Sequence, residues 1–120
     1  LAVLSDAPRR EAWLRLYQLG LHHTFDVVVT FEDTGLRKPA KEPFERVLSL
    51  LDVAPKEAVM VGDWPSRDVT GAKAVGLWTV WAQYGDTFGT HSTDADYEIA
   101  TIRDIGRVIE SINARMGGSE

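Results

Sequence analysis

The chain alternates between two patterns of apolar and polar positions. Some stretches are short, unbroken apolar runs, whereas others place an apolar residue at every third or fourth position. An unbroken run predicts a strand buried on both faces, because such a strand needs no polar alternation. The predicted strands are Leu1–Leu4, Val27–Val29, Ala58–Val61, Leu77–Trp81 and a short fifth one at Tyr97–Ile99.

The helical spacing first appears after the first strand. Pro8 suits the start of a helix and Gly20 its end, and Trp13, Leu16 and Leu19 lie on one apolar face between them. A second helix is predicted before the third strand. Its apolar positions are Phe44, Val47, Leu48 and Leu51.

Two further helices are predicted in the second half of the chain. A short one covers about residues 66–74 and stops before Gly76. The last one starts at a capping box formed by Thr101 and Asp104. Its apolar positions are Ile102, Ile105, Ile109, Ile112 and Met116.

Buried strands that alternate with helices predict an α/β fold, in which a parallel sheet lies between two helical layers. We therefore expect a three-layer, Rossmann-like domain over residues 1–116 and a disordered tail at 117–120.

Composition and charge narrow the function. The 120 residues are 44% hydrophobic and 26% charged, as in an ordinary single soluble domain. The absence of cysteine excludes disulfides and cysteine-based metal or nucleophile sites. A net charge of -5 argues against nucleic acid as a partner. Neither a membrane-spanning run nor a signal peptide is visible, so we expect a cytoplasmic protein that does not bind membranes.

Polar side chains follow the predicted strands at the edge where parallel sheets bind ligands. Ser5 and Asp6 follow the first strand, Asp63 follows the third, and Lys38 precedes Pro39 just before a helix. Each has an ordinary interpretation when taken alone. A serine at a strand end is commonly a turn or capping residue, and a lysine is commonly a solvated charge. Their order and placement together favour a site.

That ordered set resembles motifs two, three and four of the haloacid dehalogenase (HAD) superfamily. The matches are Ser5 at a strand end, Lys38 before a proline, and the stretch Val-Gly-Asp-Trp-Pro-Ser-Arg-Asp at 61–68. The stretches at 25–30 and 71–76 also resemble phosphatase-type members of that superfamily. The resemblance covers about residues 1–110.

The resemblance implies a Mg²⁺-dependent phosphohydrolase that acts on a small phosphorylated molecule through an aspartyl-phosphate. Ser5 and the backbone N–H of Asp6 would bind a phosphoryl oxygen. Lys38 would neutralise the developing charge and keep the nucleophile ionised. Asp63 would bind Mg²⁺, and Asp68 would support the ion directly or through water.

One motif of the superfamily is not matched in this sequence. Its nucleophile is an Asp in a D-x-D motif after a central strand, and no such motif follows an apolar strand here. Asp94-Ala95-Asp96 has the right spelling but lies in a polar stretch, which we interpret as a loop. We therefore expect a sheet that lacks its first, central strand between 1–5 and 58–61, and a chain that is inactive alone and binds Mg²⁺ weakly.

Exposed strand edges also predict either direct pairing of these two strands or a homodimer. Two other functions remain open: a non-catalytic phosphate-binding or assembly module, and the haloacid dehalogenase branch. The two acids Asp63 and Asp68 favour a metal site, and therefore the phosphatase branch.

Overall fold

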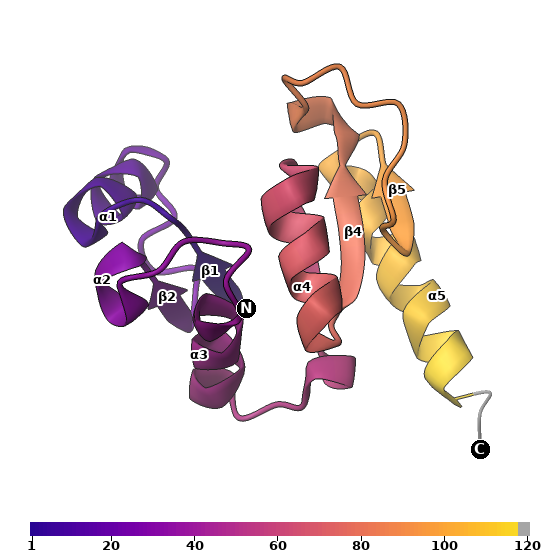
Figure 1. Ribbon diagram of the computed structural model, residues 1–120, viewed down its shortest axis with the longest axis horizontal. Coiled ribbons are helices and arrows are strands. Elements are labelled where there is room, and N and C mark those ends of the chain that lie inside the picture. Colours follow the sequence, from indigo (N-terminus) through magenta and orange to yellow (C-terminus); the bar gives the residue numbers. More distant parts are fainter. Residues whose placement is uncertain (118–120) are drawn as a thin grey trace.

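The computed structural model describes residues 1–117, which form an α/β structure with short strands and helices in alternation (Figure 1). The strands are β1 (Ala2–Leu4), β2 (Val27–Val29), β3 (Val59–Gly62), β4 (Trp78–Ala82) and β5 (Tyr97–Ile99). The α-helices are α1 (Arg9–Gln18), α2 (Phe31–Thr34), α3 (Lys41–Leu51), α4 (Thr70–Val75) and α5 (Ile105–Gly117). Tighter or wider helical turns are η1 (Pro55–Glu57), η2 (Pro65–Val69), η3 (Gln83–Gly85) and η4 (Ile102–Asp104).

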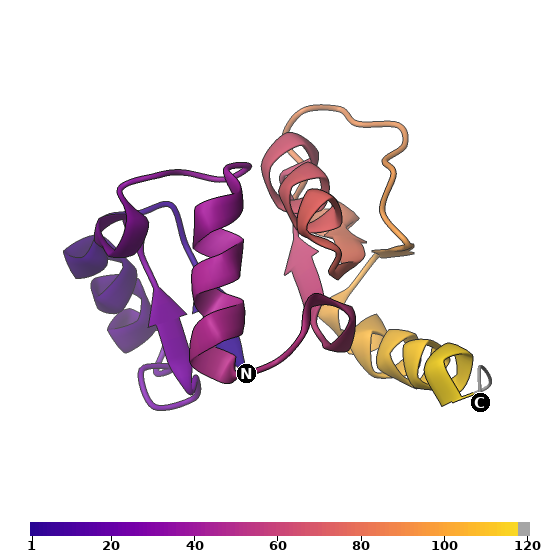
Figure 2. The ribbon, with the colours of Figure 1, turned by 60° about the horizontal axis from the view of Figure 1, so that its bottom comes forward.

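The strands form two separate parallel sheets. β1 pairs with β2, and β3, β4 and β5 pair in that order. Within residues 1–117, no ladder joins β1 to β3, and Figures 1 and 2 show the two halves of the chain side by side. The α/β prediction with parallel strands is confirmed. The sheet is interrupted between the two strands that were expected to flank a missing central strand, so of the two predicted arrangements, direct pairing of these strands is not the one that this structure adopts.

The main apolar cluster lies in the second half of the chain, between the three-stranded sheet and α5. α4 and α5 lie on opposite sides of that sheet in both views (Figure 2). The buried residues of the cluster are Val80, Ala82, Ile99, Val108 and Ile112. The second sheet is therefore covered on both faces, as its unbroken apolar strands predict.

The two halves meet where α3 packs against α4. The Phe44 side chain is buried, and a Cβ atom added to Gly71 would lie 2.4 Å from its ring. Glycine at this position therefore allows the two helices to approach closely. The contact brings the loop before α3, which carries Lys38, close to the turn that precedes α4.

The predicted apolar face of the first helix is wrong in part. Ala12 and Leu16 are buried, whereas Trp13, Tyr17 and Leu19 are exposed. The buried face of α1 is therefore a narrow stripe, with Ala12 and Leu16 one helical turn apart.

The apolar face of the last helix is also shifted. Val108 and Ile112 are buried, whereas Ile109 and Met116 are partly exposed. The capping box is confirmed, because Thr101 and Asp104 make both of its reciprocal interactions. Gly117, which was assigned to the predicted tail, belongs to α5, and the other residues of that tail, 118–120, lie outside the described part. No helix within residues 1–117 has both the length and the apolar character to cross a bilayer.

Candidate functional site

A buried ion pair joins the two halves of the chain. Lys38 Nζ lies 2.7 Å from Asp68 Oδ1, and the two side chains are only 11% and 7% exposed. The same ammonium donates to the backbone carbonyl of Leu4 at the end of β1, at 3.3 Å. An ammonium carries three donor hydrogens, so these contacts leave one for a ligand.

Asp68 is fixed from a second side. Its Oδ2 accepts a hydrogen bond from the backbone N–H of Trp64 at 3.0 Å. A Cβ atom added to Gly62 would lie 2.3 Å from Asp68 Oδ2. Only glycine at this position lets the end of β3 lie so close to the carboxylate. Both oxygens of Asp68 are therefore occupied by donors from the protein. Its placement suits a residue that holds Lys38 better than one that coordinates a metal directly.

The turn after β1 presents unused donors beside Lys38. Ser5 Oγ accepts a hydrogen bond from the backbone N–H of Ala7 at 3.1 Å, which leaves its own hydroxyl hydrogen free. The backbone N–H of Asp6 has no acceptor among residues 1–117. Together with the third hydrogen of Lys38, these groups form a concentration of donors suited to an anion.

Asp6 also makes contacts that the sequence pattern does not reveal. Its Oδ1 accepts a hydrogen bond from the backbone N–H of Lys38 at 2.9 Å, and its Oδ2 pairs with Arg67 Nη1 at 3.2 Å. The guanidinium of Arg67 lies over the Trp64 ring, 3.8 Å from its centroid. Sequence reasoning missed Arg67 as a site residue, although it belongs to the stretch at 61–68 that carries the motif.

Asp63 follows β3 and differs from Asp68 in being exposed. Within residues 1–117 its carboxylate has no hydrogen bond or ion pair, while its backbone carbonyl accepts from Trp81 Nε1 at 3.3 Å. A Cβ atom at Gly85 would lie 2.4 Å from Asp63 Oδ2, so glycine there leaves room for the carboxylate. No group of three or more metal-binding side chains exists in the described part of the chain. Asp63 alone thus offers a free carboxylate at this edge.

The Asp94-Ala95-Asp96 sequence has a structural role. Asp96 Oδ2 accepts hydrogen bonds from the backbone N–H and the hydroxyl of Thr79, at 2.8 and 3.0 Å. Thr79 lies near the amino end of β4, away from the strand ends that carry Ser5 and Asp63. The prediction that these residues form a loop is confirmed.

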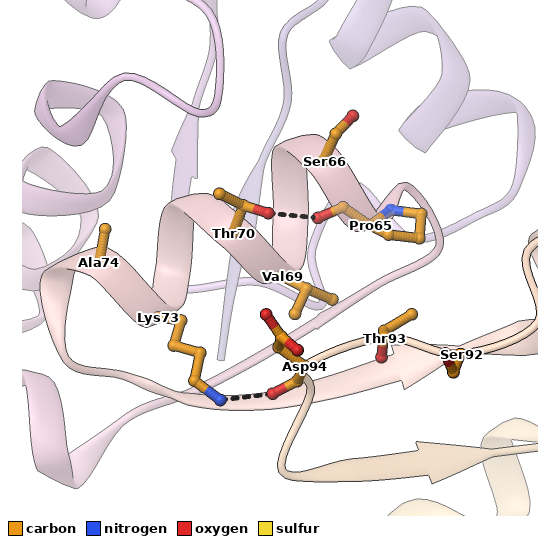
Figure 3. A pocket seen from close by; sticks show the side chains of 9 residues that line it. All are labelled: Pro65, Ser66, Val69, Thr70, Lys73, Ala74, Ser92, Thr93 and Asp94. Carbon is orange, nitrogen blue, oxygen red and sulfur yellow. Dashed lines mark hydrogen bonds between the residues drawn. The ribbon is translucent and has the colours of Figure 1, made fainter.

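An open cavity of about 490 Å³ lies between the helical turns after β3 and the loop before β5 (Figure 3). Two hydrogen bonds join residues that line it: the Thr70 hydroxyl donates to the Pro65 carbonyl, and the Lys73 ammonium donates to the Asp94 carbonyl. None of the predicted site residues lines it. Its lining residues are Pro65, Ser66, Val69, Thr70, Lys73, Ala74, Ser92, Thr93 and Asp94.

Comparison with known proteins identifies the family to which this fold belongs. The family model of haloacid dehalogenase-like hydrolases matches residues 1–82, which is more than half of the chain. The chain belongs to that family. The prediction from the three motifs is confirmed at this level.

Individual relatives agree with this family. Glyceraldehyde 3-phosphate phosphatase of Pyrococcus furiosus is 32% identical over 114 residues, which cover 92% of this chain and 48% of that protein. The structure of a HAD phosphatase from Thermococcus onnurineus has a TM-score of 0.82 at 38% identity and covers 91% of this chain and 49% of that one. The 2-haloacid dehalogenase from Pseudomonas syringae has a TM-score of 0.70 at 31% identity and covers 80% and 42%. The chain thus spans about half the length of the relatives it matches.

Proposed function

We propose that this chain forms the phosphate-binding part of a Mg²⁺-dependent phosphohydrolase that acts on a small phosphorylated molecule. The observation that carries the proposal is the Lys38 ammonium. It is held between Asp68 and the end of β1 with a donor hydrogen unused, beside the free donors of Ser5 and Asp6. Phosphatase relatives at 32% and 38% identity support the same reaction class.

The donors have separate roles towards a phosphoryl group. The Ser5 hydroxyl and the backbone N–H of Asp6 bind one phosphoryl oxygen and orient the group. Lys38 opposes the negative charge that develops on the oxygens and keeps a neighbouring carboxylate nucleophile ionised. Asp68 acts through Lys38, since the ion pair and the Trp64 N–H fix both of its oxygens.

The residues present fit a magnesium ion at one point. Mg²⁺ in phosphoryl-transfer sites uses one or two carboxylates and keeps several waters, and the exposed carboxylate of Asp63 provides one. When bound there, the ion supplies positive charge for the transferred phosphoryl group. Because one carboxylate is a poor site alone, we expect affinity at about the millimolar level or weaker.

The nucleophile of the proposed reaction is an Asp that residues 1–117 do not place at this edge. Asp63 and Asp68 have other roles, and Asp96 caps the start of β4. A strand lying between β1 and β3 would deliver an Asp to the donors of Ser5 and Lys38. Its carboxylate would attack phosphorus and release the alcohol, and water would then hydrolyse the acyl phosphate.

The test is hydrolysis of an aryl phosphate with and without Mg²⁺. We expect no turnover by the 120-residue chain. We expect metal-dependent turnover by a protein that also includes the sequence encoded just upstream of Leu1, if that sequence carries a D-x-D motif after an apolar run. Asp63→Asn should then abolish the activity. Metal-dependent turnover by the short chain that Asp63→Asn removes would contradict the assignment of the nucleophile.

The dehalogenase likeness gives a second candidate. A haloacid dehalogenase would release halide from a 2-haloacid without need of a metal, whereas the exposed carboxylate of Asp63 favours metal-dependent chemistry. Halide release that EDTA leaves unchanged would select the dehalogenase. Phosphate binding without turnover of either substrate would select a binding module.

A further inference from the structure

Asp6 places a negative charge where the proposed function, on which this inference rests, requires an anion to bind. Its backbone N–H is one of the proposed phosphate donors, yet its side chain is a carboxylate only 16% exposed. A partly buried charge is screened weakly by solvent and salt, so it acts strongly on a neighbouring anion. Without compensation, Asp6 would repel the phosphate that its own backbone binds.

Arg67 is the residue placed to compensate this charge. Its Nη1 lies 3.2 Å from Asp6 Oδ2, which is the oxygen that does not accept from the Lys38 backbone. It comes from the turn after β3 and therefore reaches across from the opposite half of the chain. Lys38 does not serve this role, because its ammonium is paired with Asp68.

The aromatic pair beneath Arg67 limits where its guanidinium can go. The Cζ atom of Arg67 lies 3.8 Å from the centroid of the Trp64 ring. Phe88 packs against the same ring, with the two ring centroids 5.0 Å apart. A guanidinium stacked on a ring keeps its plane and its fork of donors in a set direction. Trp64 therefore orients Arg67 towards Asp6 instead of towards solvent.

We propose that Arg67 is a positioning residue that neutralises Asp6 and thereby permits a phosphate to bind at Ser5 and Asp6. The ion pair has a second effect, because it holds the Asp6 carboxylate to one side and leaves the backbone N–H facing the anion site. Arg67 acts through Asp6 and not by direct contact with the phosphate.

The experiment is a titration of the 120-residue chain with inorganic phosphate, followed by the amide NMR signals of residues 5–7. Arg67→Gln should weaken binding by about fivefold to tenfold, which is the effect of an uncompensated charge a few ångströms away in a medium between protein and water. Asp6→Asn keeps an acceptor for the Lys38 N–H but removes the charge, and it should strengthen binding. The double variant should bind within about twofold of the unsubstituted chain, because both charges are gone.

The double variant separates compensation from a merely structural bridge. If the ion pair only braced the loop, the double variant would bind as weakly as Arg67→Gln, and the inference would be overturned. Arg107→Gln is the matched control, since it also removes one arginine from an ion pair, here the exposed pair between Arg107 on α5 and Asp104 in η4. Its phosphate affinity should stay unchanged.

Each remaining outcome has a distinct meaning. No phosphate binding by the unsubstituted chain would overturn both the proposed function and this inference. Binding that Arg67→Gln leaves unchanged would overturn the inference alone. Should Arg67→Gln fail to fold by circular dichroism, Asp6→Asn decides by itself: tighter binding supports compensation, and equal or weaker binding rejects it.

Discussion

At the scale of single residues, burial decides which ion pairs matter. Lys38 and Asp68 are both nearly inaccessible and 2.7 Å apart, whereas Arg107 is exposed and lies 3.7 Å from Asp104. A buried charge that loses its partner costs about 3–5 kcal/mol, while an exposed pair contributes about 0–1 kcal/mol. The Lys38–Asp68 pair thus holds the site together, whereas the Arg107–Asp104 pair contributes little to stability.

We predict that Lys38→Met lowers the free energy of unfolding by about 3 kcal/mol, because it leaves the Asp68 carboxylate with only the Trp64 N–H. Replacing Asp68 by Leu in the same variant should recover much of the loss, since no buried charge then remains. Urea denaturation of the variants measures both effects, with Arg107→Gln as the exposed control. A loss as small as that of the control would contradict the prediction.

Asp86 holds the loop that carries Phe88, and its ionisation gives a pH-dependent prediction. The Thr90 backbone N–H, helped by the Thr90 hydroxyl, lowers the pKa of Asp86 below its usual value of 3.8. Because the pKa of Asp86 is lower in the folded state, ionised Asp86 stabilises the fold above pH 3.8. That stabilisation is lost as the pH falls through the pKa of Asp86 in the folded state.

We therefore expect the Asp86 carboxyl carbon to titrate below 3.8 in an NMR experiment, and Thr90→Ala to raise that pKa partway by removing the hydroxyl donor. The Trp64–Phe88 contact should loosen over the same pH range. Titration of Asp86 at or above 3.8 would show that the loop does not depend on this carboxylate.

At the residue level, local rules account for where the predicted site residues lie, but not for their distant contacts. Ser5 follows β1, Lys38 lies in the loop before α3 and Asp68 in the turn after β3, and the topology of a parallel sheet brings such positions to one edge. Arg67 and Asp6 are 61 positions apart, and their pairing depends on how two separate halves dock. No periodicity encodes such a contact.

At the scale of elements, the strands were predictable and the helix faces only partly so. β2 and β5 have the predicted bounds, and the other strands differ by one residue. Which apolar residues of a helix are buried depends on what packs against that helix, and the spacing of apolar residues does not contain this information. Leu19, directly after α1, is exposed, whereas Val108 on α5 is buried against the strands of the second sheet.

The α3–α4 contact depends on one glycine. We predict that Gly71→Ala destabilises the chain by about 1–3 kcal/mol, because its Cβ would lie 2.4 Å from the Phe44 ring and 3.1 Å from the Pro39 Cα. Gly106→Ala is the matched control, since that Cβ on α5 meets nothing within 4 Å, and it should stabilise by about 0.5–1 kcal/mol. Thermal unfolding compares the two. Equal effects of the two substitutions would argue against close packing of α3 on α4.

At the scale of the whole molecule, the free edges of β1 and β3 are the features that bear on self-association. Ser5 N donates to Val29 O, so the odd-numbered backbone groups of β1 face β2, and those of Ala2 and Leu4 face away from it. The Leu4 carbonyl on this edge is the one that accepts from Lys38. The remaining groups of that edge and of β3 form a template for an added strand.

We predict that the 120-residue chain self-associates through these edges, because pairing satisfies backbone groups that no ladder pairs within residues 1–117. Sedimentation equilibrium should show a dimer that increases with concentration, and hydrogen exchange at residues 2–4 and 59–62 should slow in parallel. Ala2→Pro removes the N–H that faces the free edge and should weaken the dimer, whereas Ala2→Ser keeps that N–H and should not. A species that stays monomeric at all concentrations, with rapid exchange in both strands, would show that the edges remain open in solution.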